Sequence, residues 1–193
     1  MEEGEMKDQP CELLVIGGSA GSIDALVKIL PGIKKQILFS IVIVLHRKKS
    51  TDSGLADLFS LRTTIPVKEI EDKDSLKAGA IFLAPADYHL LFEKDKSVSL
   101  DYSEKVNYSR PSIDVAFESA ANVYGQALAC LLLSGANADG SAGLNIVKQK
   151  GGLIAVQDPD TAESPYMPQQ AINSVNVKNV LSPEEIVEFI NSL

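Results

Sequence analysis

The sequence predicts an α/β fold: a doubly wound, mostly parallel sheet with a small antiparallel meander insertion. Short apolar runs alternate along the chain with segments whose apolar residues recur at helical spacing. This alternation is typical of β-α-β units joined by right-handed crossovers. The runs at 40–45 and 127–133 are apolar almost throughout, as strands buried on both faces of a parallel sheet are. Both observations favour helices on the two faces of one sheet.

The first half of the chain predicts parallel strands followed by the meander. A strand at 13–16 passes through a run of small residues into a helix at 23–30, whose apolar residues repeat three and four positions apart. A β-branched run then predicts a strand at 40–45, followed by a moderately helical segment at 51–61 and a short strand at 65–70. Brief strands at 80–83, 88–93 and 97–100, separated by polar turns, predict the antiparallel meander.

The second half returns to alternating helices and strands. Helical spacing over 111–124 ends at Gly125, and a fully apolar strand follows at 127–133. Further helices are expected at 144–150 and 167–174, and further strands at 153–156 and 179–181. Ser182, Pro183 and Glu185 have the pattern of a capping box with proline at the first helical position, which opens the last helix.

Length and composition limit the classes of protein to consider. The 193 residues, of which 45% are hydrophobic, suffice for one sizeable core, so we expect a frayed tail at 1–10 and one domain at 11–193. A net charge of −8 without a long basic block argues against nucleic acid as a partner. The apolar runs are too short to span a membrane and the charged start is unlike a signal peptide, so a cytoplasmic protein without membrane insertion is expected. Cys11 and Cys130 are interpreted as buried thiols, with neither a disulfide nor a metal site.

The turn at 17–22 permits two functional interpretations, a phosphate-binding loop or a turn that presents a nucleophile. The dinucleotide fingerprint requires three glycines, and counting from Gly17 the other two positions hold Ser19 and Ser22. A P-loop lysine is also missing. The pattern G-x-S-x-G does fit, with Gly17 and Gly21 around Ser19. Serine in such a turn is also a common helix N-cap, and that alternative stays open.

Three polar side chains follow three predicted strands. Ser19 follows the first strand, His46 follows the second, and Asp139 lies just past the strand at 127–133. In a doubly wound sheet the first strand lies at the centre, so the carboxyl ends of these strands would meet in one crevice. A serine, a histidine and an aspartate together activate a hydroxyl for nucleophilic attack. Each residue also has a structural alternative: an N-cap for Ser19, a loop residue for His46, and a turn or N-cap for Asp139.

Backbone amides near this crevice would stabilise an oxyanion. One set lies at the helix N-terminus after Ser19, where Ala20 is the first donor, and another lies in the turn Gly135-Ala136-Asn137. The second histidine, His89, lies in the meander and is interpreted as structural.

The chain resembles the catalytic domain of the chemotaxis protein-glutamate methylesterases, the CheB family, over nearly its whole length. The motifs that carry this resemblance are Ile16-Gly17-Gly18-Ser19, His46 after the second strand, Phe82-Leu83-Ala84-Pro85, Arg110-Pro111-Ser112-Ile113-Asp114-Val115, Ser134-Gly135, Asp139-Gly140-Ser141-Ala142-Gly143-Leu144 and Met167-Pro168-Gln169-Gln170-Ala171-Ile172. Several motifs in the same order are far more specific than any one of them.

The resemblance implies a serine hydrolase that demethylates glutamate γ-methyl esters on the cytoplasmic helical bundle of methyl-accepting chemotaxis receptors, releasing methanol. It also implies deamidation of particular receptor glutamines. Ser19 would be the nucleophile, His46 the base and Asp139 the orienting acid, with the amide of Ala136 as the second oxyanion donor. No metal or organic cofactor is implied, and the oligomeric state is left open. Asp114 is interpreted as favouring the dipole of its own helix rather than as catalytic.

The sequence departs from the family pattern around the predicted site. Ala20 stands where the family usually has serine or threonine. Arg47, Lys48 and Lys49 stand where it has apolar residues and proline, and Gly135-Ala136-Asn137 replaces Gly-Met-Gly. These departures keep open a catalytically weak, methylesterase-like binding module in a signalling assembly. A nucleotide-binding domain of the same architecture is a further alternative, opposed by the missing glycines. About ten residues precede the first strand, so we expect a catalytic domain without a receiver domain, either as a free-standing esterase or as an excerpt of a longer chain.

Overall fold

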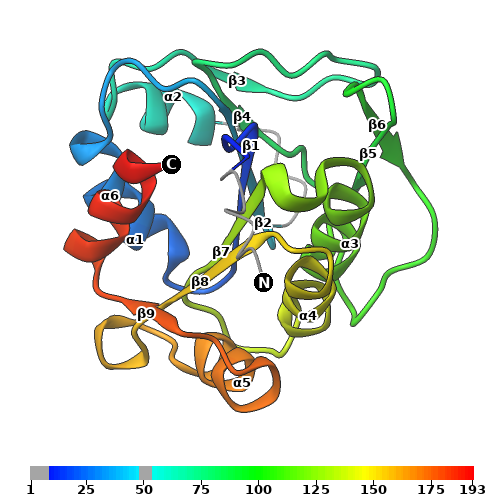
Figure 1. The fold of residues 1–193 in the computed structure, drawn as a ribbon. Coiled ribbons are helices and arrows are strands. Elements are labelled where there is room, and N and C mark those ends of the chain that lie inside the picture. Colours follow the sequence, from blue (N-terminus) through cyan, green and yellow to red (C-terminus); the bar gives the residue numbers. More distant parts are fainter. Residues whose placement is uncertain (1–8, 48–53) are drawn as a thin grey trace, which may run out of the picture.

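The computed structural model describes residues 9–47 and 54–193. Its main sheet has seven strands in the order β3-β4-β2-β1-β7-β8-β9, and every neighbouring pair is parallel. The strands are β1 (Leu13–Gly18), β2 (Ser40–Leu45), β3 (Val67–Glu69), β4 (Ile81–Leu83), β7 (Leu128–Leu132), β8 (Leu153–Gln157) and β9 (Asn179–Leu181). Because β1 lies between β2 and β7, the first half of the chain builds one side of the sheet and the second half builds the other (Figure 1).

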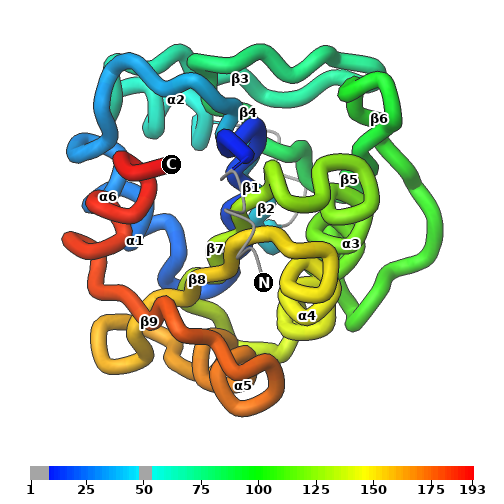
Figure 2. Tube along the Cα trace, in the orientation of Figure 1, coloured from blue at the N-terminus to red at the C-terminus, as the bar shows by residue number. Residues whose placement is uncertain are grey.

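Helices cover both faces of this sheet, as the fold class predicts. One face carries α1 (Ser22–Ile29), α2 (Leu55–Ser60) and α6 (Pro183–Ser192), and the other carries α3 (Ile113–Tyr124), α4 (Ser141–Gln149) and α5 (Tyr166–Val175) (Figure 2). Short 3₁₀ turns lie at Leu30–Gly32, Gly125–Ala127 and Pro159–Thr161. Side chains of β1 alternate between the faces: Leu14 and Ile16 pack toward α1, Leu13 and Val15 toward α3. This double burial explains why the central strands are continuously apolar.

The antiparallel insertion is smaller than predicted. Among the strands in the described ranges, β5 (His89–Phe92) and β6 (Val98–Asp101) form the one antiparallel pair, which packs against α3; isolated antiparallel bridges also join Ser75 to Ser97 and Val106 to Ser109. The third expected meander strand, at 80–83, is a correction: Ile81–Leu83 pairs in parallel with both β2 and β3. All three of its residues are buried, as an interior strand of the parallel sheet requires.

The starts of α3 and α4 differ from the predictions by two or three residues, and in both helices a distant carboxylate caps the first turn. The expected helix at 144–150 begins at Ser141, and the helix expected from 111 begins at Ile113, after the N-cap Ser112. Residues 1–8 of the expected tail and 51–53 of the expected helix at 51–61 lie outside the described residues. Cys11 and Cys130 are free thiols, of which Cys130 is buried and Cys11 half-buried. Within 9–47 and 54–193, every helix is too short or too polar to cross a bilayer.

Candidate active site

The carboxyl end of β1 brings three segments together. The amide of His46 donates to the Gly18 carbonyl (3.1 Å), and the amide of Ser19 donates to the Ser134 carbonyl (2.9 Å). The residue that follows β1 therefore lies between the ends of β2 and β7. The structure thus joins at one edge of the sheet the three segments that carry Ser19, His46 and Asp139.

The turn after β1 leaves the Ser19 hydroxyl without a capping role. Gly21, with φ +78°, is the N-cap of α1, and no side chain caps this helix. A Cβ at Gly21 would come within 2.6 Å of Glu163 Cβ, so the turn requires glycine there. The Ser22 hydroxyl donates to the Ser19 carbonyl and holds the turn closed. The N-cap alternative for Ser19 is therefore wrong, and its half-buried hydroxyl hydrogen-bonds no described residue.

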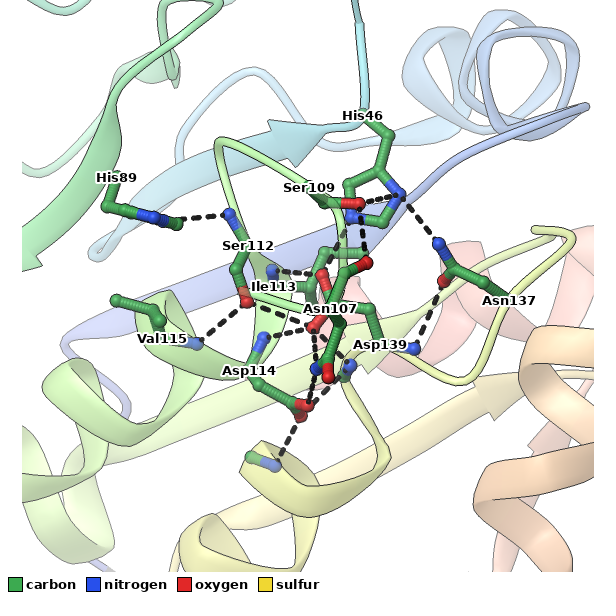
Figure 3. Close-up of polar contacts among 12 residues, drawn as sticks. His46, His89, Asn107, Ser109, Ser112, Ile113, Asp114, Val115, Asn137 and Asp139 are labelled. Carbon is green, nitrogen blue, oxygen red and sulfur yellow. Dashed lines mark hydrogen bonds and ion pairs between the residues drawn. The ribbon is translucent and has the colours of Figure 1, made fainter. Parts of the chain in front are cut away.

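His46 and Asp139 are in direct contact. His46 Nε2 lies 2.7 Å from Asp139 Oδ2, and the aspartate side chain is fully buried. Since a carboxylate only accepts, the contact requires a proton on Nε2, and in the neutral ring this tautomer leaves the lone pair on Nδ1. The Ser109 hydroxyl (3.4 Å) and the Asn137 amide nitrogen (3.5 Å) lie near Nδ1 (Figure 3). His46 and Asp139 are therefore in contact, as predicted. Ser19 lies at the end of the neighbouring strand, and its hydroxyl forms no hydrogen bond with His46.

The carboxylate of Asp139 also closes the N-terminus of α3. It accepts hydrogen bonds from the amides of Ile113 (2.7 Å) and Asp114 (3.0 Å) and from the Ser112 hydroxyl (3.0 Å). Burial alone would raise the pKa of Asp139, but the His46 hydrogen bond and these amides outweigh burial and lower it to about 2. Asp139 is therefore ionised at neutral pH, next to the positive end of a helix dipole.

Asp114 performs the same task for α4. Its Oδ1 accepts from the amides of Gly140 (2.9 Å) and Gly143 (2.7 Å). Asp114 lies in the first turn of α3, as its interpretation requires, and its carboxylate also caps the neighbouring helix, which the sequence did not predict. Burial raises the pKa of Asp114 to about 6; the Gly143 amide opposes this shift, and the negative charge of Asp139 adds to it. We call the Asp139 and Asp114 contacts the reciprocal caps: each helix is capped by a carboxylate from the segment that opens the other.

Sequence reasoning missed several residues of this site. Asn107 donates to Asp114 Oδ2 (3.1 Å) and lies 3.5 Å from Asp139 Oδ1, while Ser109 and Asn137 approach His46. Nothing in the spacing of these residues marks them. Ser112 does carry a signal, because a serine directly before a helical period is a common N-cap. His89 is buried, accepts the Ser112 amide at Nδ1 (3.1 Å) and lies with Nε2 2.9 Å from the Glu104 carbonyl, which agrees with its structural interpretation.

The two predicted oxyanion donors lie in exposed turns at the same edge. No described residue accepts a hydrogen bond from the amide of Ala20 or of Ala136. The Ser134 hydroxyl donates to the Ala20 carbonyl (2.7 Å) and ties the two turns together. Gly135 anchors the second turn, since its amide donates to the Ser164 carbonyl (3.0 Å). Both amides are thus held in place and remain available to a ligand.

Two cavities flank the His46–Asp139 pair. The first, of about 420 Å³, is lined by His46, Arg47, Asp87, Lys105, Tyr108, Ser109 and Arg110. The second, of about 570 Å³, lies on the side of Asp139, and its lining includes Asp114, Asn137, Asp139, Ser141 and Tyr108. Arg47 is held by the Ala84 carbonyl (3.1 Å) and by Glu69 (3.2 Å), whereas Lys48 and Lys49 lie outside the described residues. In the part of the chain that the structure describes, no three His, Cys, Asp or Glu side chains gather as metal ligands.

Residues 14–190 match the family model described as CheB methylesterase. The chain belongs to the CheB family. A crystal structure of the Thermotoga maritima CheB methylesterase catalytic domain superposes on it with a TM-score of 0.90 and 30% sequence identity, over 95% of this chain and 99% of that one. The predicted family and fold class are therefore confirmed.

Relatives of this CheB chain differ in length. A protein of Leptospira interrogans (strain Fiocruz L1-130) is 47% identical over 178 residues and covers 92% of both chains; it is named as a candidate protein-glutamate methylesterase/protein-glutamine glutaminase. A Thermotoga maritima protein named protein-glutamate methylesterase/protein-glutamine glutaminase is 31% identical over 93% of this chain, but the match covers only 54% of that relative. Membership in CheB favours the esterase interpretation over a nucleotide-binding domain.

Proposed function

We propose that this chain is a serine esterase that demethylates glutamate γ-methyl esters on methyl-accepting chemotaxis receptors and deamidates receptor glutamines. Its site of action would be the cytoplasmic helical bundle of the receptor. The names of its relatives support protein glutamate methyl esters and protein glutamines as the groups on which it acts. The observation that carries the proposal is the 2.7 Å contact between His46 and the buried Asp139, on the strand end next to Ser19, whose hydroxyl caps no helix.

The reaction follows from the protonation state of His46. Nε2 is committed to Asp139, so Nδ1 accepts the Ser19 proton while the serine oxygen attacks the ester carbonyl. The tetrahedral intermediate collapses with cleavage of the bond to the methoxy oxygen, and the imidazolium protonates that oxygen to give methanol. Water then attacks the glutamyl ester of Ser19 and loses a proton to Nδ1. The bond to Ser19 Oγ breaks, the imidazolium returns this proton to the serine oxygen, and the glutamate side chain of the receptor is released. Asp139 stabilises the imidazolium in both steps.

A small movement completes the proposed triad. The backbones of Ser19 and His46 are tied through Gly18, at the spacing of adjacent strands of about 4.8 Å. With the His46 ring held by Asp139, we expect rotation of the Ser19 side chain to bring its hydroxyl to Nδ1, since catalytic hydrogen bonds commonly tighten only when substrate is bound. Since Ser109 and Asn137 lie near Nδ1 in the free protein, substrate entry is expected to displace their contacts.

The amides of Ala20 and Ala136 are the proposed oxyanion donors. Their accessibility supports the proposal, because an oxyanion hole requires donors that are fixed before charge develops. Ala20 replaces a hydroxyl residue of the family, but a backbone donor does not depend on the side chain.

Methanol release from a methylated receptor tests the proposal. We expect release by the wild-type protein and none above background by Ser19→Ala. A serine-directed phosphonate should label Ser19, as mass spectrometry of the tryptic peptide reports. Equal background release from both proteins, with Ser19 unlabelled, would favour the binding-module alternative that Ala20 and Arg47 keep open.

A further inference from the structure

The segment between β6 and α3 ends in an unusual turn beside the candidate site. Val106 and Ser109 exchange two backbone hydrogen bonds (3.2 and 2.9 Å) and so close a two-residue hairpin turn. Its central residues, Asn107 and Tyr108, have φ of +50° and +62°. A hairpin turn with both central residues in the left-handed region is type I′, for which Asn-Gly is the preferred sequence. Tyr108 thus occupies the position that favours glycine.

Neither backbone preference nor packing explains a tyrosine at this position. Bulky side chains are rare at positive φ. The Tyr108 side chain is 98% exposed, so burial does not offset the backbone strain. Strained residues that persist without structural gain are typical of functional sites. The side chain of Tyr108 therefore requires an explanation outside the fold of the isolated chain.

The location of the turn connects Tyr108 with the reaction site. The neighbour on one side, Ser109, lies 3.4 Å from His46 Nδ1, and the neighbour on the other side, Asn107, donates to Asp114 (Figure 3). Tyr108 lines both cavities that flank the His46–Asp139 pair. Tyr108 therefore belongs to the lining that the two cavities share, and the residues on either side of it in the chain contact the site.

The lining of the first cavity also carries an unpaired positive charge. Of the three cations that line the first cavity, Arg47 pairs with Glu69 and Arg110 pairs with Asp87. Lys105 is exposed, and no residue in the described ranges forms an ion pair with it. On a protein of net charge −8, a free lysine beside the cavity favours approach of an acidic partner at this point.

We propose that Tyr108 and Lys105 form a docking rim for the helix of the substrate protein that carries the methylated glutamate. Tyr108 packs on an apolar side chain of this helix, and Lys105 pairs with an acidic one. Exposed tyrosines are well suited to such contacts, since they bury a large area at a small cost in side-chain entropy. This inference rests on the proposed function for the identity of its partner.

Binding to a catalytically silent protein tests the docking rim. The probe is the methylated cytoplasmic fragment of a chemoreceptor from the source organism, titrated by calorimetry into Ser19→Ala. We expect Tyr108→Gly in this background to weaken the affinity by roughly tenfold or more, as the loss of a central aromatic contact does. Tyr108→Phe should retain most of the affinity. Lys105→Gln should weaken binding and flatten its dependence on salt, because the screened ion pair is gone.

Two controls separate docking from folding. Tyr108→Gly relieves the left-handed tyrosine, so its Tm should equal or exceed that of the parent, and weaker binding cannot then be a consequence of unfolding. Leu61→Ala, which removes a side chain that is 84% exposed and lines neither cavity, should leave the affinity unchanged.

Binding and methanol release test the docking rim and the proposed esterase function separately. If Tyr108→Gly binds within twofold of the parent, or if the parent does not bind the fragment, the docking rim is wrong. Methanol release by the wild-type protein is measured separately. Release with unaltered binding would overturn the docking rim and keep the esterase. Binding that depends on Tyr108, without any release, would keep the docking rim and overturn the esterase.

Discussion

The carboxylate of Asp139 is shared between the ring of His46 and the first turn of α3. One oxygen accepts from His46 Nε2 and from the Ile113 amide, while the other accepts from Ser112 and from the Asp114 amide. Both oxygens face donors only. An amide in place of the carboxylate must therefore direct its NH₂ group toward another N–H or O–H donor.

Replacing Asp139 with asparagine should consequently lower kcat/KM for the methyl ester on the order of 10⁴-fold, since His46 loses its acceptor and its required tautomer. A fall in Tm should accompany this loss. The matched control is Asp158→Asn, which alters a cap of the 3₁₀ turn Pro159–Thr161 and should leave kcat/KM unchanged. A loss of less than tenfold for Asp139→Asn would contradict the role proposed for the carboxylate.

Asp114 makes the stability of the protein depend on pH. Its pKa is about 6 in the folded protein against an ordinary value of 3.8, so the folded state binds this proton more tightly than the unfolded chain does. The resulting stabilisation is complete below about pH 3.8 and is lost as the pH rises through 6. It amounts to on the order of 1–2 kcal/mol after allowance for partial exposure. Asp139 has a lowered pKa and acts in a separate window, losing its stabilisation as the pH falls toward 2.

Asp114→Asn should remove this dependence, because the amide oxygen can still accept from Gly140 and Gly143 and carries no charge. Urea unfolding at pH 4.5, 6 and 7.5 should show the variant gaining stability relative to the wild type as the pH rises. The control is Asp24→Asn, which removes a carboxylate from the exposed first turn of α1. A constant difference for Asp114→Asn would contradict the prediction.

Among the elements, α3 and α4 are joined through their N-termini. Ser112 connects the helix start with Asp139, since its hydroxyl accepts from the Val115 amide (3.4 Å) and donates to the Asp139 carboxylate (3.0 Å). Its own amide is held by His89. The start of α3 therefore supports the helix and the catalytic candidate at the same time.

Ser112→Ala should cost about 1 kcal/mol of unfolding free energy, as the loss of an N-cap does. It should also lower kcat by about tenfold, because Asp139 loses a donor that holds its orientation. Ser182→Ala breaks the capping box of α6 and is the matched control, with a similar loss of stability and no loss of kcat. An equal effect of both variants on kcat would show that stability alone matters.

In the whole molecule, one sheet joins two apolar clusters. Ile29 is fully buried in the cluster under α1 and α6, and Tyr124 belongs to the cluster under α3, α4 and α5. Alternate residues of β1 contribute to both clusters. We therefore expect residues 11–193 to unfold as one cooperative domain.

Unfolding in urea should give the same midpoint by far-ultraviolet circular dichroism and by the fluorescence of the five tyrosines, since the chain has no tryptophan. Ile29→Ala, which opens a cavity on one face, should lower the unfolding free energy by about 2–5 kcal/mol. It should shift both midpoints together, although Tyr124 lies on the opposite face. Separate midpoints would show that the two faces unfold independently.

Local pattern was sufficient to predict where most strands lie and that the central ones are buried on both faces, and the strand order agrees with the prediction that Ser19 and His46 follow neighbouring strands. A run such as 40–45 is apolar because both faces are covered, and the order of β-α units determines which strand ends meet. The pattern was insufficient where distant segments decide. The residues Ile81–Leu83 are recognisable as a strand from their sequence. Which strands they pair with, β2 and β3, depends on the path of the chain between the strands. The hydrogen bonds of Asp114 and the proximity of Asn137 to His46 depend on how α3 packs on α4, which no local spacing reveals.

The reciprocal caps limit how this chain can be recombined with its relatives. In a chimera, residues 139–149 from another member of the family would have to form these hydrogen bonds with residues 112–114 of this chain. Exchanging both stretches together keeps the matching donors and acceptors. We therefore expect the two stretches to be exchangeable only together, although 24 residues separate them along the chain. The hairpin at 106–109 closes on itself, but Asn107 donates to Asp114 and the Ser109 hydroxyl lies near His46, so both residues must be kept when the hairpin is exchanged. Exchanging position 108 alone between homologues thus offers a route to new partner preference with the reaction machinery left in place.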